Sequence, residues 1–279
     1  MINLKKINLP SNSNPTIANM TLLRLKKYQS VDLTEPSKLT IKELHALCGK
    51  SNTARVISDR NSKMPGYTLS TSAFACKTGS KLHKIDGSIC SNCYALKGNY
   101  IFPSVVNGLM TASIAVAYYD YKKDFTPWIV ALSELIRRRC IVKNIKDKQG
   151  NIIGSVDNTF FRFHDSGDIQ STLHLKAINE IALNNPSVSF WLPTREGKMV
   201  KSFLKNNTIA DNLCIRLSAH KMGVEPLSFG LDLPTSTVEW ADSEHHCIAP
   251  KQGGSCDGHL SSCRNCWDPN IPNVNYKKH

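Results

Sequence analysis

The first half of the chain contains two regions in which apolar residues recur at helical spacing. Residues 38–57 predict a short helix that begins after Thr40, a favourable N-cap residue, and ends near Gly49. Apolar residues then recur three or four positions apart over residues 105–118. A second segment continues this spacing at Trp128, Leu132, Leu135 and Ile136. We therefore expect two consecutive helices in the middle of the chain.

Beyond a turn at DKQGN, strand patterns and helix patterns alternate. The segments NTFFRFH, PSVSFWLPT and NLCIRLSAH have the apolar character of buried strands, whereas TLHLKAINEIAL and GKMVKSFLKN have helical spacing. This β-α-β-α-β order predicts a parallel sheet covered by helices. The expected fold class is α/β, as a complete or partial (β/α) barrel or an open sheet, with a C-terminal cysteine-rich metal module.

Composition divides the chain into three expected regions. The first 31 residues carry basic side chains and no acidic one, so residues 1–37 are predicted to form a basic N-terminal arm. Residues 38–234 are expected to form the barrel-like catalytic domain. Residues 235–279 are rich in Cys, His, Gly, Ser, Pro and Asn and have little apolar periodicity. We expect this tail to pack on the barrel and to be ordered by something other than a hydrophobic core.

The charge balance favours a polyanionic partner. There are 35 Lys and Arg residues against 22 Asp and Glu residues, which gives a formal net charge of +13. Such an excess offsets phosphate charge and predicts nucleic acid as the partner, although a solvated basic surface has the same composition. No apolar run is long enough to span a membrane, and the start of the chain does not read as a signal peptide. We expect no membrane association and a location in the cytoplasm of the host cell.

Ten cysteines in a chain that is expected in the cytoplasm point to metal binding or catalysis, because disulfides are rare in a reducing compartment. Four of them lie close together in the tail, at Cys247, Cys256, Cys263 and Cys266. Four thiolates around one tetrahedral zinc ion would explain how so polar a tail is ordered. An iron–sulfur cluster accepts the same four ligands, and spacing alone does not separate the two cofactors.

A second cysteine group lies nearer the N-terminus. Cys90 and Cys93 form a CxxC pair, and Cys76 precedes them. Three cysteines leave either a histidine partner such as His83 or an open coordination position, so this group is a possible second metal or cluster site. The alternative is a pair of simple buried cysteines.

The end of the FRFH strand carries the densest group of candidate catalytic side chains. Asp165 and Asp168 supply two carboxylates across a Gly turn, an arrangement that suits acid–base work. The neighbouring candidates are His164, Ser166 and Gln170. Strand alternation predicts Arg162 and His164 on the same face of the sheet. The alternative is a turn that serves as a helix cap.

Basic residues near the other helix termini are the candidate contacts to nucleic acid. Arg195 and Lys198 follow a predicted strand and lie near a helix N-terminus, where phosphate binds readily. The remaining candidates are Arg162, Lys201, Arg137 and Arg138.

Taken together, Cys76, CSNCYALKG, Pro103, Asn107, FRFHDSGD, FWLPTR and the cysteine-rich tail resemble the phage gene product 88 family. The resemblance covers roughly residues 60–270 and implies a bacteriophage protein.

Two other families share parts of this pattern. DSG-x-x-Q followed by LPTR and a cysteine metal site is similar to the tRNA-guanine transglycosylases and their DNA-modifying relatives of the DpdA type. That resemblance implies a zinc enzyme that exchanges guanine in DNA or tRNA for a 7-deazaguanine, with the small-molecule base as co-substrate. By this analogy Asp165 recognises the base or transfers a proton, Asp168 is the nucleophile or electrostatic stabiliser, and Gln170 contacts the base edge. This transferase activity is the leading expectation.

The alternative resemblance is to radical S-adenosylmethionine barrels. CSNCYA, a strand ending in SGD, a strand ending in TR and a strand reading IRLS resemble that family. The resemblance implies a 4Fe-4S cluster with S-adenosylmethionine, whose amino group the Ser166–Asp168 turn would hold. A third possibility is a non-catalytic zinc protein that binds nucleic acid.

Overall fold

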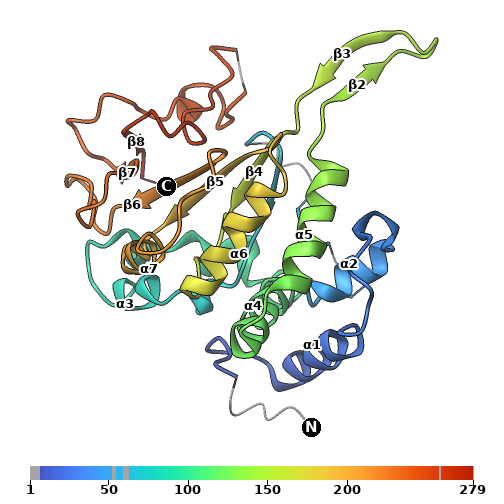
Figure 1. Cartoon of the computed structure of the whole chain (residues 1–279). Helices are drawn as coiled ribbons and strands as arrows, with labels where there is room; N and C mark the ends of the chain where they lie inside the picture. The colour runs from blue at the N-terminus through green and yellow to red at the C-terminus, as the bar shows by residue number, and fades with distance from the viewer. Residues whose placement is uncertain (1–6, 52–54, 59–62, 258, 279) are drawn as a thin grey trace.

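The computed structural model of the chain describes residues 7–51, 55–58, 63–257 and 259–278 (Figure 1). Residues 1–6 of the expected N-terminal arm lie outside this set. Within the described part, no helix has the length and apolar character needed to cross a membrane.

A six-stranded sheet forms the centre of the molecule. Its strands are β1 (Tyr67–Leu69), β4 (Phe160–Phe163), β5 (Ser189–Thr194), β6 (Leu213–Ser218), β7 (Thr235–Val238) and β8 (Asn273–Tyr276). Each strand pairs in parallel with the next one in this order. The predicted α/β class with a parallel sheet is confirmed. The sheet is open, with β1 and β8 at its two edges, so the structure shows no closed barrel.

Seven α-helices are described. They are α1 (Pro15–Lys27), α2 (Ile41–Leu47), α3 (Thr78–Leu82), α4 (Pro103–Lys122), α5 (Thr126–Arg139), α6 (Thr172–Leu183) and α7 (Gly197–Phe203). The predicted N-cap is confirmed, because Thr40 and Glu43 form a reciprocal capping box at the start of α2. The two predicted central helices are α4 and α5. Helices α6 and α7 are the crossovers from β4 to β5 and from β5 to β6.

The two faces of the sheet are covered by different parts of the chain. Phe161, Phe190 and Leu192 are buried on the face covered by helices and belong to the main hydrophobic core. On the opposite face, Trp191 packs against Trp267 of the tail, with their ring centroids 5.1 Å apart. The Trp267 indole also donates a hydrogen bond to the Phe161 carbonyl (3.1 Å). The tail therefore covers a whole face of the sheet, which we call the tail face.

Two of the expected regions contribute elements to the central fold. Strands β7 and β8 both come from residues 235–279, so the tail supplies two strands to the central sheet. The expected N-terminal arm contains α1, whose Ala18, Leu22 and Leu25 are buried in the main core. Helix α1 packs against α4 because these three side chains share one face at helical spacing.

A two-stranded hairpin projects from the body of the protein (Figure 1). It consists of β2 (Lys143–Lys146) and β3 (Ile152–Val156), paired antiparallel. The predicted DKQGN turn joins them, and Gly150 supplies a positive φ of 90° there.

Candidate functional site

The carboxyl ends of β4, β5 and β6 meet at one edge of the sheet, as expected for parallel strands. The segment between β1 and α4, residues 70–102, lies against this edge, and we call it the cysteine loop because it contains Cys76, Cys90 and Cys93. The contacts between the cysteine loop and the strand ends form the candidate site.

The turn after β4 is held tightly against the start of the cysteine loop. The Ser166 hydroxyl donates to the Thr71 carbonyl (2.8 Å), and the Thr71 amide donates to the Ser166 carbonyl (3.0 Å). The next residue, Gly167, has a φ of 82°, and a β-carbon at this position would lie 2.0 Å from Thr71 Oγ1. Position 167 therefore requires glycine for both conformation and space.

Asp168 joins the ends of β4 and β5. Its Oδ1 accepts hydrogen bonds from Thr194 Oγ1 (2.6 Å) and from its neighbour's amide at Ile169 (2.8 Å). Its Oδ2 accepts from the Arg195 amide (2.9 Å). Burial raises the pKa of Asp168 to about 6, against the opposing effect of these hydrogen bonds. Both oxygens are engaged, so this carboxylate holds two strand ends in register.

Glu196 fastens the cysteine loop to the end of β5. Its buried carboxylate accepts hydrogen bonds from the amide (2.6 Å) and the hydroxyl (2.8 Å) of Thr78, the first residue of α3. A carboxylate suits this position because it compensates unpaired amides at a helix start. The sequence prediction missed this role, since it considered only the basic residues of the TREGK segment.

Asp165 faces two tyrosines of the cysteine loop. The Tyr100 hydroxyl donates to Asp165 Oδ2 (3.1 Å), and the Tyr94 hydroxyl donates to the Asp165 carbonyl. Asp165 Oδ1 is buried and has no hydrogen-bond partner among the described atoms. Burial, and then the Asp165 charge, raise the pKa of Tyr100. Asp165 therefore retains one oxygen for a further partner.

The three cysteines of the loop come together beside these carboxylates. A β-carbon placed on Gly79 would lie 3.6 Å from Cys76 Sγ and 3.7 Å from Cys90 Sγ, so both sulfurs border the same small space. Burial raises the pKa of the Cys76 thiol, and the charges of Asp168, Cys93 and Cys90 raise it further. Burial also raises the pKa of Cys90, whereas the charge of Arg195 lowers it.

His164 lies away from this site, contrary to the prediction from strand alternation. It is buried between β4 and α6, with its ring centroid 5.7 Å from that of His174. Neither ring nitrogen has a hydrogen-bond partner among the described residues, and burial lowers the pKa of His164 well below its usual value. Arg162 lies on the opposite, tail face, with its guanidinium 4.5 Å from the Trp191 ring. Alternation fails because β4 ends at Phe163 and the chain turns at His164.

Gln170 lies beside His174, and its predicted contact with a base stays a prediction. Its backbone amide donates to His174 Nδ1 (3.2 Å), and its side-chain nitrogen is buried without a described partner. The predicted catalytic group is therefore divided: Asp165, Ser166 and Asp168 border the cysteine loop, whereas His164 contacts the helix side.

The predicted nucleic-acid contacts lie in two separate places. Arg195 is at the site, with its Nε donating to the Ala219 carbonyl after β6 (3.2 Å). Lys198 and Lys201 are exposed on α7, next to this edge. Arg137 and Arg138 lie near the amino end of β4 instead, and both form ion pairs with Glu134.

The four tail cysteines line one small cavity of about 10 Å³, together with His246. Burial raises the pKa of Cys256 to about 11 and that of Cys266 to about 12. Among the described residues, no group of three or more His, Cys, Asp or Glu side chains is placed so that it could hold a metal ion without rearrangement of the side chains. Both predicted metal sites therefore stay predictions.

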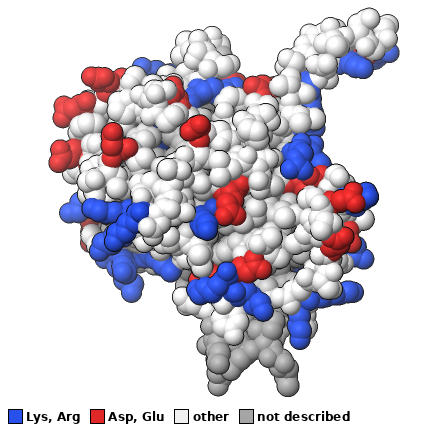
Figure 2. All heavy atoms as spheres, in the orientation of Figure 1, with Lys and Arg blue, Asp and Glu red and all other residues white. Residues whose placement is uncertain are grey.

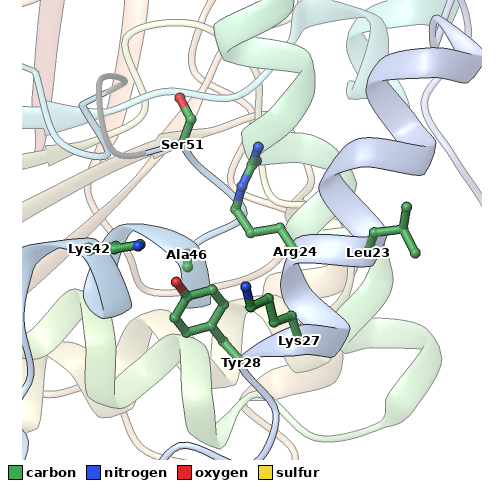
Figure 3. Close-up of a pocket in the computed structure, with 7 residues that line it drawn as sticks. All are labelled: Leu23, Arg24, Lys27, Tyr28, Lys42, Ala46 and Ser51. Atoms are coloured by element: carbon green, nitrogen blue, oxygen red, sulfur yellow. The ribbon is translucent and has the colours of Figure 1, made fainter.

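A larger pocket of about 480 Å³ lies between α1 and α2 (Figure 3). Its lining residues are Leu23, Arg24, Lys27, Tyr28, Lys42, Ala46 and Ser51. Three of these side chains are basic and none is acidic, so the pocket is suited to an anion. None of them comes from the strand ends or the cysteine loop.

The comparisons with known proteins identify a family. A family model described as Gene product 88 matches residues 41–275, which is most of the chain. No curated protein and no solved structure matches. The expected resemblance is confirmed, and the chain belongs to the Gene product 88 family of phage gene products.

Proposed function

We propose that this chain is an iron–sulfur enzyme of the radical S-adenosylmethionine kind that modifies nucleic acid. One observation carries the proposal. The three-cysteine loop follows the first strand of a six-stranded parallel sheet, and it packs on the Ser166–Gly167–Asp168 turn that follows the neighbouring strand. This reverses the order of the two enzyme hypotheses drawn from the sequence, in which the transglycosylase came first.

Three thiols at this edge are the donor set that a four-iron cluster of this kind would use. Cys76 and Cys90 present their sulfurs to one space beside Gly79, and Cys93 is the third thiol. Three cysteine ligands would leave one iron open for the cofactor, which would bind beside the Ser166–Asp168 turn. When bound, such a cluster supplies the electron for reductive cleavage of S-adenosylmethionine.

The chain's own residues support that role in three ways. Glu196 holds α3, and with it the backbone beside Cys76, against the end of β5. Burial raises the pKa of Cys90, and the charge of Arg195 offsets part of this rise. Asp165, held by Tyr100, keeps its unpartnered Oδ1 available to bind or exchange a proton with the substrate.

The surface around the cysteine loop supports nucleic acid as the substrate. Lys and Arg side chains gather over α3 and α7, as Figure 2 shows. The exposed lysines of these segments include Lys77, Lys81, Lys84, Lys97, Lys198 and Lys201. Tyr94, Ile101 and Phe102 of the same loop are 47%, 61% and 55% exposed. Cations beside exposed aromatic rings suit an unpaired nucleotide, whose phosphate and base they contact together.

Anaerobic reconstitution with iron and sulfide tests the cluster. We expect brown protein that absorbs near about 400 nm and that forms 5′-deoxyadenosine from S-adenosylmethionine when reduced. Cys90→Ser should lose both properties. Cys140→Ser is the matched control. It should leave both properties unchanged, because Cys140 is buried in the helical core. A wild-type chain that takes up no iron, or a Cys90→Ser chain that keeps it, would contradict the proposal.

Anisotropy of labelled single-stranded oligonucleotides tests the substrate class. We expect affinity to fall about tenfold or more between low and physiological salt. Phe102→Ala should weaken binding by about tenfold through lost stacking. Lys122→Ala, at the far end of α4, is the control and should have little effect. Binding that is insensitive to both salt and Phe102→Ala would argue against this substrate.

The transglycosylase is the second candidate, and the unpartnered Oδ1 of Asp165 favours it. In that case Asp165 is the available catalytic carboxylate, because both oxygens of Asp168 are engaged. Colourless protein that incorporates labelled guanine into DNA or tRNA, and loses this activity in Asp165→Asn, would establish the exchange reaction instead. Mass spectrometry of nucleosides from expressing cells identifies the product in either case.

A further inference from the structure

The guanidinium of Arg216 is completely buried on the tail face of the sheet. Its NH1 donates to the carbonyls of Thr235 and Ile271, and its NH2 donates to those of Asn265 and Asp268, each at 2.9 Å. Among the described residues, no carboxylate lies within ion-pair distance of it. Its Nε is buried without a partner among the described residues. Carbonyls accept from the other two nitrogens but do not neutralise the charge, and an unpaired buried charge is unfavourable.

The cavity of the four tail cysteines lies next to this arginine in space. Asn265, whose carbonyl accepts from Arg216, also lines the cavity, and Cys266 follows it directly. Cys266 Sγ is 3.2 Å from the Tyr276 hydroxyl of β8, which places this sulfur against the sheet. Arg162, whose Nε is buried without a described partner, lies on the same face.

We propose that Cys247, Cys256, Cys263 and Cys266 bind one divalent ion of the zinc class, and that this centre is the counter-charge of Arg216. Four thiolates around a divalent cation carry a net double negative charge. The buried arginine then has an anionic partner that carbonyls alone do not provide. The centre also stabilises a tail segment that contains one 3-10 turn, Ala249–Lys251, and few buried apolar residues.

The size of the cavity favours a single ion over a cluster. About 10 Å³ is close to the volume that one water-sized sphere occupies. Zinc–sulfur bonds of about 2.3 Å require the four thiols to turn into the cavity that they already line. This inference is independent of the iron–sulfur proposal, which uses the other cysteine group.

Elemental analysis and cobalt substitution of the full chain test the proposal. We expect one zinc per chain, and cobalt in its place should give the intense thiolate-to-cobalt charge-transfer bands of a four-sulfur site. Cys263→Ser should weaken or remove these bands. Cys140→Ser is the control, since Cys140 is buried in the main hydrophobic core and does not line the cavity. If Cys263→Ser fails to fold, the band intensity of the wild-type chain still reports the number of thiolate ligands.

The role of Arg216 is tested by conservative and neutral replacements. Arg216→Met should lower zinc affinity by about tenfold or more, and Arg216→Lys should restore part of it, because the charge rather than the packing supports the centre. Zinc retention in Cys90→Ser, together with loss in Cys263→Ser, separates this site from the loop cluster. A wild-type chain that binds neither zinc nor cobalt, or an unchanged affinity in Arg216→Met, would overturn the inference.

Discussion

The buried pair His164 and His174 predicts how the stability of this protein depends on pH. His174 has no exposed surface and packs between Phe125 and Trp128, with ring centroids 6.0 and 5.4 Å away. Burial lowers its pKa from 6.5 to about 3, so it stays neutral in the folded chain through mild acid. The unfolded chain binds this proton below about pH 6.5, and the folded chain does not. Stability is therefore complete above pH 6.5 and decreases as the pH falls below it.

The size of the loss follows from the two pKa values. Each pH unit below 6.5 lowers the free energy of unfolding by about 1.4 kcal/mol. Lowering the pH from 7 to 5 therefore reduces it by about 2 kcal/mol through His174 alone. His164 contributes in the same direction, because burial also lowers its pKa. These losses add to those of other titrating groups, so a comparison between variants is needed to isolate them.

Urea unfolding followed by tryptophan fluorescence at pH 7, 6 and 5 measures the effect. We expect His174→Phe, which removes the titrating ring, to lose about 2 kcal/mol less than the wild type between pH 7 and 5. Ile178→Val in the same helix is the control, because it should lower the free energy of unfolding by about 1 kcal/mol at every pH. Equal losses in the wild type and His174→Phe would refute the assignment of His174 as a neutral core residue.

Three further predictions concern the edge that holds the cysteine loop. Gly79→Ala should reduce the iron bound after reconstitution, since its methyl group would enter the space bordered by two sulfurs; unchanged iron content would contradict this. Glu196→Gln should lower the free energy of unfolding by about 1–2 kcal/mol, because an amide replaces one of the two acceptors of Thr78, and urea unfolding at pH 7 measures it. Gly167→Ala should destabilise the chain by about 2 kcal/mol or more through contact with Thr71, and a urea midpoint equal to that of the wild type would be inconsistent with the observed turn.

Much of the architecture was predictable because it depends on local pattern. Apolar periodicity located α4 and α5, and the alternation of strand and helix segments predicted a parallel sheet with polar strand ends at one edge. The capping box at Thr40 was visible for the same reason, since its partner is three residues away. The grouping of cysteines in the sequence also anticipated that the four tail thiols line a common cavity.

Only the tertiary structure decided the contacts that join distant segments. Strands β7 and β8 are four residues each and largely polar. Their buried polar side chains pair with each other, as in the hydrogen bond from Thr237 to Asn275 (3.1 Å). His164 lies on the helix side because β4 ends at Phe163, just before it. The hydrogen bonds between Glu196 and Thr78 join residues that are 118 positions apart in the chain. Such contacts depend on which strands become neighbours. Local spacing does not encode that choice, because it is made by packing and hydrogen bonding across the whole chain.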